Sequence, residues 1–127
     1  MVNMDDIKQK KIAVVGVSRR EDKYGFKIFK TLREGGYNAE GINPTNGEIL
    51  GKRIYRSLGE LGYAPDLVIT VVPHAVTERI VDECRRLGVK EIWMQPGSES
   101  EEAIKKAVDA GISVTHNACF MVAKRLW

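Results

Sequence analysis

The sequence predicts an α/β fold, with a doubly wound, five-stranded and mainly parallel sheet, flanking helices and a single domain over residues 1–127. Five short runs rich in β-branched residues alternate with segments of helical spacing, a pattern typical of parallel strands joined by right-handed crossovers. Continuous apolar runs such as "LVITVV" indicate burial on both faces of the sheet. The expected strands are residues 12–15, 38–42, 66–72, 91–94 and 112–115.

The segments after the first and third strands have helical spacing. Phe26, Phe29 and Leu32 recur three residues apart, and the glycine pair at residues 35–36 ends that helix. A second apolar stripe follows the third strand and ends at Gly88. Its members are Val76, Ile80, Cys84 and Leu87.

The remaining segments are shorter or more irregular. After the fourth strand, "SESE" predicts a capping box in which Ser98 pairs with Glu101 at the start of a helix that Gly111 ends. We expect a last short helix within residues 117–127, with Asn117 as its cap. Residues 43–65 are broken by prolines and glycines, and we expect a loop with a short helical turn there.

Composition restricts the classes of ligand and location. The net charge of +3 is too small for the dense basic surface of a dedicated nucleic-acid binder, but it suits a small anionic ligand. The first residues lack the apolar stretch of a signal peptide, and the longest uncharged run, residues 110–123, is shorter than the ~20 residues that span a bilayer. Two cysteines do not make a disulfide framework. We therefore expect a cytoplasmic protein with no membrane or nucleic-acid partner.

In a doubly wound sheet the ligand binds at the carboxyl ends of the strands. The residues that follow the strands are therefore the candidates for a site. In chain order they read "GVSRREDKYG" (16–25), "NPTNG" (43–47), "PHA" (73–75), "QPG" (95–97) and "HNACFM" (116–121).

The first of these loops predicts a phosphate site. A dinucleotide fingerprint would continue from Gly16 with two more glycines, where this chain has Ser18 and Glu21, and the second strand does not end in the acidic residue that binds a ribose. The loop instead carries several cations just before the N-terminus of a helix, where backbone amides and positive charge favour phosphate. These cations are Arg19, Arg20 and Lys23.

The strand ends together resemble the small coenzyme A-binding domain family, the stand-alone relatives of the N-terminal domain of the succinyl-CoA synthetase α-subunit. The resemblance rests on five pieces and runs from about Lys11 to Met121. They are "AVVGVSRREDKYG", "GINPTNGEILGKRIYRSL", "DLVITVVPHAVTERIVDEC", "EIWMQPGSESEEA" and "VTHNACFMV". The resemblance implies a Rossmann-like fold and a site for coenzyme A or an acyl-CoA.

The resemblance also implies a role for each strand end. Gly16, Val17 and Ser18 would lie against the pyrophosphate, and Arg19, Arg20 or Lys23 would reach its oxygens. Asn43 and Pro44 would face the adenosine, with Lys52 or Arg53 as a partner for the ribose 3′-phosphate. Val72, Pro73 and His74 would line the far side of the cofactor. Gln95, Pro96 and Gly97 would flank the pantetheine arm, with Asn117 and Cys119 near its thiol end.

The sequence shows no catalytic constellation and no metal site. His116 and Cys119 have a spacing that could bind metal, but only one further cysteine is present, so a closed zinc site is not expected. The leading interpretation is a non-catalytic module that binds coenzyme A or an acyl-CoA as a carrier, sensor or accessory subunit, acting as a monomer or homodimer. Two alternatives stay open: an NAD(P)-type regulatory domain, and a small acyl-CoA enzyme or subunit of a split acyl-CoA synthetase.

Overall fold

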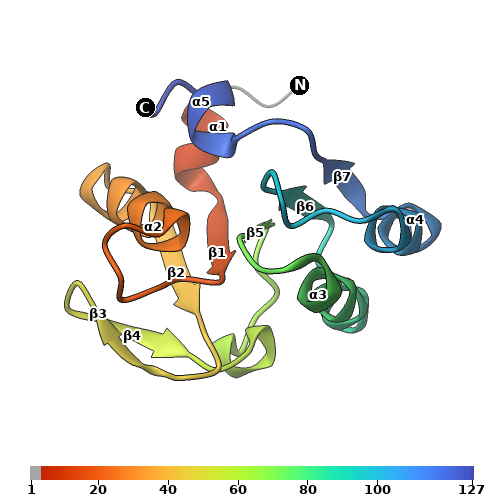
Figure 1. Ribbon diagram of the computed structural model, residues 1–127, viewed down its shortest axis with the longest axis horizontal. Coiled ribbons are helices and arrows are strands. Elements are labelled where there is room, and N and C mark those ends of the chain that lie inside the picture. Colours follow the sequence, from red (N-terminus) through yellow and green to blue (C-terminus); the bar gives the residue numbers. More distant parts are fainter. Residues whose placement is uncertain (1–3) are drawn as a thin grey trace.

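The computed structural model describes residues 4–127, which form one seven-stranded sheet with helices on both faces (Figure 1). The strands are β1 (Lys11–Val15), β2 (Asn38–Ile42), β3 (Gly47–Ile49), β4 (Lys52–Tyr55), β5 (Leu67–Thr70), β6 (Glu91–Met94) and β7 (Ser113–Thr115). The helices are α1 (Met4–Gln9), α2 (Tyr24–Glu34), α3 (His74–Leu87), α4 (Glu101–Asp109) and α5 (Phe120–Ala123), with a 3-10 turn η1 (Leu58–Leu61).

The order of the strands places the ligand crevice. Across the sheet the order is β3-β4-β2-β1-β5-β6-β7, and each strand pair is parallel except β3 with β4. If β3 is left out and the others are numbered along the chain, the order is 3-2-1-4-5-6, that of doubly wound nucleotide-binding folds. The order reverses between β1 and β5, and the crevice is expected at this switch point.

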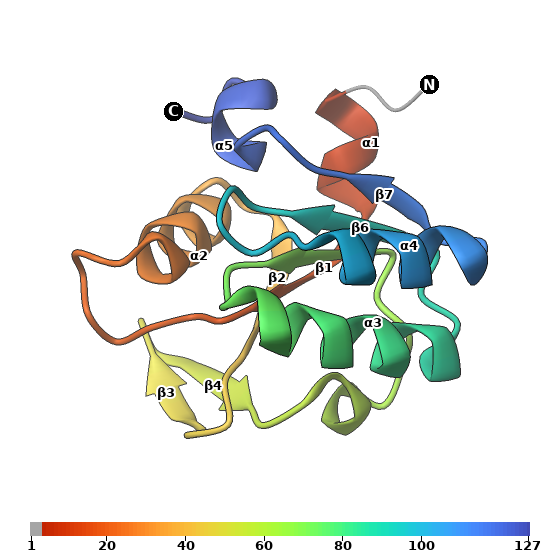
Figure 2. The same ribbon diagram turned by 45° about the vertical axis from the view of Figure 1, so that its right-hand side comes forward.

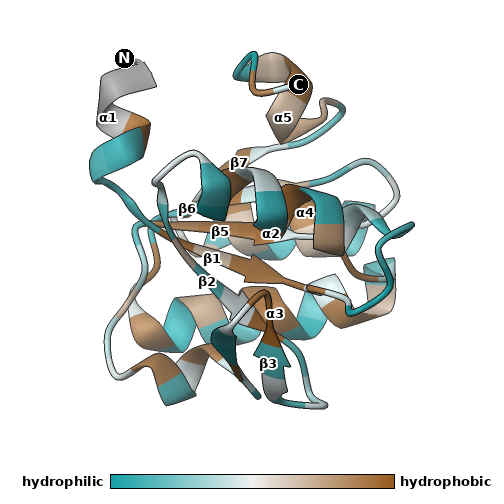
Figure 3. Ribbon diagram, turned by 90° about the vertical axis from the view of Figure 1, so that its left-hand side faces the viewer, coloured by the Kyte–Doolittle hydropathy of each residue, from teal (hydrophilic) through white to brown (hydrophobic). Residues whose placement is uncertain are grey.

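Two apolar clusters, one on each face of the sheet, hold the helices in place. Along β1, Ile12 and Val14 join the cluster that includes residues of α1, α2 and α5, whereas Ala13 and Val15 join the cluster of α3 and α4. This alternation follows from the period of two in a β-strand. The two helical layers lie on opposite sides of the sheet (Figure 2), and hydropathy colouring shows apolar central strands between helices with hydrophilic outer positions (Figure 3).

Five of the strands lie where the sequence predicts them, but the prediction of a five-stranded sheet is wrong because β3 and β4 extend it. These two strands form a hairpin in the segment expected as a loop, with Ile49 opposite Lys52. Its two-residue turn, Leu50 and Gly51, has φ values of +54° and +76°, the signature of a type I′ turn. Asn-Gly usually marks this turn, and a leucine in its place conceals it. The expected short helical turn is present as η1.

Two expected caps are also corrected. Helix α4 is capped by Ser100, whose hydroxyl accepts a hydrogen bond from the Ala103 amide, and not by Ser98. The Ser98 side chain is buried behind the strand ends. Helix α5 follows Cys119 and not Asn117, which precedes it with a φ of +63°. None of the helices within residues 4–127 has the length and apolar character needed to cross a bilayer.

The conformation of Leu50 gives a first prediction. A non-glycine residue with left-handed φ costs about 1 kcal/mol, and asparagine tolerates this region better than leucine. The Leu50 side chain is half exposed, so little packing is lost on substitution. We expect Leu50→Asn to raise the free energy of unfolding by about 1 kcal/mol in urea titrations followed by circular dichroism. Leu50→Ala, whose methyl group cannot make the local hydrogen bonds by which asparagine tolerates this region, serves as the control without this gain. Equal stability of the two variants would contradict the assignment of strain.

Candidate functional site

The backbone passes close to itself at the switch point. Gly16 ends β1 with a φ of +106°, and its amide donates to the Ile42 carbonyl at 3.0 Å. A Cβ on Gly16 would overlap the Val71 carbonyl oxygen, and a Cβ on Gly25 would overlap the Gly16 carbonyl oxygen. Two glycines therefore let the end of β1, the segment after β5 and the start of α2 meet at one point.

Hydrogen bonds join the β1–α2 loop to the loop after β2. The Asn43 side-chain amide donates to the Val17 carbonyl at 2.7 Å, and its Oδ1 accepts from the Thr45 amide at 2.7 Å. The Arg19 guanidinium donates to the Thr45 hydroxyl at 3.4 Å and to the Asn46 carbonyl. Val17 is buried in the core, so its backbone and not its side chain faces the crevice. Asn43 and Arg19 thus brace the loop.

The two other cations of the loop are exposed like Arg19, but they make no hydrogen bond to the loop after β2 among the described residues. Arg20 is exposed and pairs with Asp22 at 3.1 Å, a surface ion pair of the kind that contributes little energy. Lys23 is exposed at the N-cap position of α2, and no side chain caps that terminus within the described chain. The amides of the first turn of α2, together with Arg20 and Lys23, therefore present positive charge that a phosphate group would match.

A rigid turn closes the far side of the crevice. The Ser98 amide donates to the Gln95 carbonyl at 2.9 Å, with Pro96 and a left-handed Gly97 between them, as in a type II turn. The buried Ser98 hydroxyl lies 2.8 Å from the Thr70 hydroxyl and 2.8 Å from the Gln95 carbonyl oxygen. The serine that the sequence analysis placed in a helix cap therefore fastens this turn to β5.

Two adjoining hollows lie at the carboxyl ends of β5 and β6. The first, here the apolar hollow, has a volume of about 270 Å³ and is lined by Tyr24, Val71, Gln95, Pro96, Cys119, Val122 and Trp127. The second, here the proline hollow, measures about 300 Å³ and is lined by Val71, Val72, Pro73, Pro96, Gly97 and Ser98. Val71 and Pro96 belong to both, so the two form one crevice.

Gln95 joins β6 to the segment before α5. Its Oε1 accepts from the Phe120 amide at 2.6 Å, and its Nε2 donates to the Cys119 Sγ at 3.4 Å. Two residues before Gln95, the Trp93 indole donates to the Ala118 carbonyl at 2.8 Å and packs edge-on against the Phe120 ring. These contacts hold Cys119 at the wall of the apolar hollow.

The outer wall of the apolar hollow comes from α2 and the last described residue. The rings of Tyr24 and Trp127 stack with their centroids 6.0 Å apart, and the Trp127 indole donates to the Thr31 hydroxyl at 2.9 Å. Both rings are largely exposed. Tyr24 falls within the candidate loop of residues 16–25, but the sequence analysis gave it no role of its own. Val71 was counted as part of a strand, and Val122 and Trp127 lie outside the candidate loops.

Six of the residues predicted for the site line this crevice: Val72, Pro73, Gln95, Pro96, Gly97 and Cys119. Three of the others lie apart from it or make contacts of a different kind. Lys52 and Arg53 open β4, so they lie at its amino end and not at the carboxyl edge. Lys52 pairs with Glu40 at 3.3 Å, and the Arg53 guanidinium lies over the Tyr55 ring at 4.5 Å. Their suggested contact with a 3′-phosphate stays a prediction. His74 is exposed at the start of α3, with Nδ1 4.0 Å from Glu78.

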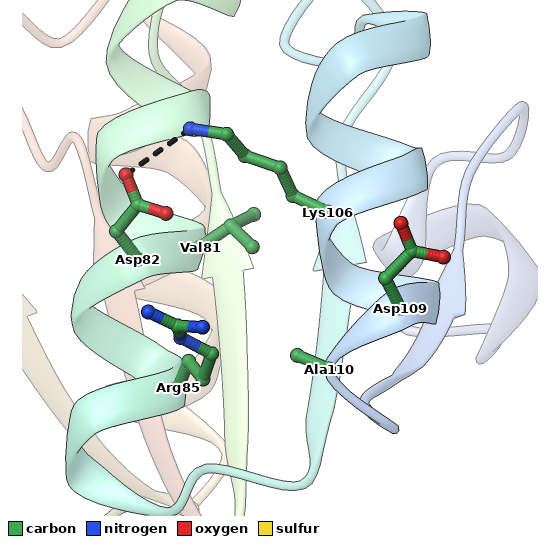
Figure 4. Close-up of a pocket in the computed structure, with 6 residues that line it drawn as sticks. All are labelled: Val81, Asp82, Arg85, Lys106, Asp109 and Ala110. Carbon is green, nitrogen blue, oxygen red and sulfur yellow. Dashed lines mark hydrogen bonds and ion pairs between the residues drawn. The ribbon is translucent and has the colours of Figure 1, made fainter.

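The described residues contain no cluster of metal ligands, and the hollow between α3 and α4 differs from the crevice at the strand ends. No group of three or more His, Cys, Asp or Glu side chains suited to a metal ion is found among the described residues. A further hollow lies between α3 and α4, where Lys106 pairs with Asp82 at 3.1 Å beside Arg85 and Asp109 (Figure 4). It lies on a helical face and not at the strand ends, and its acidic and basic groups are balanced.

Comparison with known proteins identifies the relatives of the chain. The model of the family described as CoA binding domain matches residues 10–125. The uncharacterized protein YneT of Bacillus subtilis is 30% identical over 116 residues, which cover 91% of this chain and 86% of that protein. An ADP-forming acetate–CoA ligase of Methanocaldococcus jannaschii is 36% identical over 81 residues, which cover 64% of this chain but only 12% of the ligase.

The fold has a close counterpart among solved structures. A conserved hypothetical protein from Pyrococcus furiosus superimposes with a TM-score of 0.85 at 38% sequence identity. The superposition covers 90% of this chain and 98% of that one. The Rossmann-like arrangement is therefore shared over nearly the whole length of both chains.

The two cysteines should differ sharply in reactivity. Burial, with the neighbouring Glu83 carboxylate, raises the pKa of the Cys84 thiol to about 12, so it stays protonated and shielded. Cys119 is only half-buried and lines the apolar hollow. We expect iodoacetamide at pH 8 to alkylate native protein once, at Cys119, and to reach Cys84 only after unfolding. Intact mass and peptide mapping measure this, with Cys119→Ser as the control; comparable labelling of Cys84 in the native state would contradict it.

Proposed function

The chain belongs to the CoA binding domain family, and we propose that it binds coenzyme A or an acyl-CoA at the crevice at the carboxyl ends of β1, β5 and β6. The observation that carries the proposal is that a site suited to phosphate and an apolar channel adjoin each other at the strand ends. A basic, uncapped helix N-terminus lies on one side, and a long and mainly apolar pair of hollows lies on the other. Coenzyme A has the same two parts, a multiply charged nucleotide and a flexible arm.

The nucleotide end would bind at the β1–α2 loop. The backbone of Gly16, Val17 and Ser18 would lie against the pyrophosphate, as would the first amides of α2. Arg20 and Lys23 are the cations best placed to reach its oxygens, because Arg19 is already engaged with the loop after β2. Asn43 and Pro44 would border the adenosine. Arginine donates in a planar fork that fits phosphate oxygens, and such charge-assisted hydrogen bonds are about twice as strong as neutral ones.

The arm would cross the strand ends. Gly16 touches Val71 and Val72, so the phosphate loop continues directly into the proline hollow. The arm would run beside Pro73 and His74 and along Pro96 and Gly97. The thiol end would then reach Gln95 and Cys119, with Asn117 close by in sequence. This path has the apolar walls that a pantetheine arm requires.

We propose further that the module itself is non-catalytic and acts as a carrier, sensor or accessory subunit. The two histidines support this role. His74 lies at the start of α3 and His116 follows β7, and among the described residues neither is hydrogen-bonded to a serine, threonine or cysteine that it could activate. The similarity to an acetate–CoA ligase supports a second candidate, a subunit of a split acyl-CoA synthetase. An NAD(P) site is less well supported, because Ser18 and Glu21 replace the fingerprint glycines and Asn43 follows β2 where an acid is required.

Calorimetric titration tests the ligand. We expect coenzyme A to bind more tightly than dephospho-coenzyme A, and NADH and NADPH to bind more weakly than either. Arg20→Ala and Lys23→Ala should each weaken coenzyme A binding by roughly tenfold or more, since a hydrogen bond to a charged group contributes about 1.5–3 kcal/mol.

Lys105→Ala, which removes an exposed cation from α4, is the matched control and should leave the affinity unchanged. Tighter binding of NADH than of coenzyme A would overturn the proposal. Turnover of acetyl-CoA with ADP and phosphate by the isolated chain would replace the non-catalytic role with the enzymatic one.

A further inference from the structure

We propose that the apolar hollow binds the acyl group of acyl-CoA thioesters and selects short, uncharged acyl chains. This inference rests on the coenzyme A site proposed above. It assigns to Tyr24, Val122 and Trp127 a role in recognising the group attached to the thiol, which is separate from the binding of the nucleotide.

The hollow lies where a thioester would end. Two strand spacings of about 4.8 Å separate the end of β1, which carries the phosphate loop, from the end of β6, which carries Gln95 and Pro96. The shared residues Val71 and Pro96 join the apolar hollow to the proline hollow that the arm would cross. A group beyond the thiol therefore enters the apolar hollow from the side of the crevice.

The size of the hollow fits a short chain. Its volume of about 270 Å³ exceeds the ~150 Å³ of an engineered apolar cavity that holds benzene. The Tyr24–Trp127 stack forms its outer wall, and Val122 of α5 projects from the same side. Val122 is 63% exposed and Trp127 is 49% exposed, so an acyl chain bound between them would remove apolar surface from water.

The chemistry of the lining selects against charge. None of the seven residues that line the hollow is acidic or basic. The main polar group, the Gln95 side chain, already accepts from the Phe120 amide and donates to the Cys119 sulfur. Lys27 lies over the Tyr24 ring, and both Lys27 and Lys30 line a separate hollow on the outer side of Tyr24 and Trp127, outside this lining. A carboxylate placed in the hollow would lose water and would find only the neutral Tyr24 hydroxyl and Gln95 amide as donors, with no cation in the lining to compensate its charge, which is costly.

Titration calorimetry with coenzyme A and its acetyl, butyryl and succinyl thioesters tests the inference. Each buried methylene contributes ~0.8 kcal/mol, or about fourfold in affinity, so butyryl-CoA, with two more methylenes, should bind roughly fifteenfold more tightly than acetyl-CoA. Succinyl-CoA has the same four-carbon length as butyryl-CoA but ends in a carboxylate. It should bind no more tightly than coenzyme A itself.

Val122→Phe fills the hollow from an exposed position, so the fold should persist, and circular dichroism verifies this. In this variant the ratio of the butyryl-CoA and acetyl-CoA affinities should fall to about one. Val108→Phe is the matched control, because Val108 is 60% exposed on α4 and lies outside the hollow. This control should keep the roughly fifteenfold ratio.

The possible outcomes separate this inference from the proposed function. Tighter binding of butyryl-CoA that Val122→Phe abolishes and Val108→Phe retains supports the inference. Equal affinity for all four ligands, tight binding of succinyl-CoA, or an unchanged ratio in Val122→Phe overturns it while coenzyme A binding stands. Failure of all four ligands to bind overturns the proposed function as well. A wild-type dimer in sedimentation that Val122→Phe dissociates would show that a second copy covers the hollow, and this too overturns the inference.

Discussion

The contact between three backbone segments at Gly16 is the constraint on which the site depends. The end of β1, the segment after β5 and the first turn of α2 approach so closely that a single added carbon at Gly16 or Gly25 would overlap a carbonyl oxygen. This approach brings the amides of a helix N-terminus to the switch point of the sheet. It also sets the phosphate loop directly beside the hollows at β5 and β6. Without it, the charged and apolar parts of the crevice would be separate surfaces.

The cations of the phosphate loop divide into two groups. Arg19 donates to groups in the loop after β2, and Asn43 holds the same two loops from the other side. All three side chains are exposed, but those of Arg20 and Lys23 make no hydrogen bond to another loop among the described residues. Composition alone cannot make this distinction, because all three residues belong to one basic run. The structure shows that one of the three cations joins two loops, and the phosphate-binding role proposed above rests on the other two.

The sequence was sufficient for the parts of the fold that have regular patterns. The five apolar strands and the helix ended by the glycine pair at residues 35–36 follow from periodicity, and the carboxyl-end rule locates the crevice. Three features were not predicted, because the sequence signal for each is weak or fits two positions equally well. The hairpin of β3 and β4 turns through Leu50, Ser98 and Ser100 are equally plausible as caps, and Trp127 reaches α2 only through tertiary contact. Spacing along the chain carries no information on such long-range contacts.

The outermost strands of the sheet have a consequence for behaviour at high concentration. β3 and β7 contain only three residues each, and β3 carries an exposed glutamate, Glu48. The unpaired amides and carbonyls of an edge strand can pair with a strand of another molecule, which leads to aggregation. Short edge strands and charged side chains are common protections against such pairing. The seven-stranded sheet therefore ends on both sides in borders that discourage cross-β polymerisation, while its apolar strands stay enclosed in the middle.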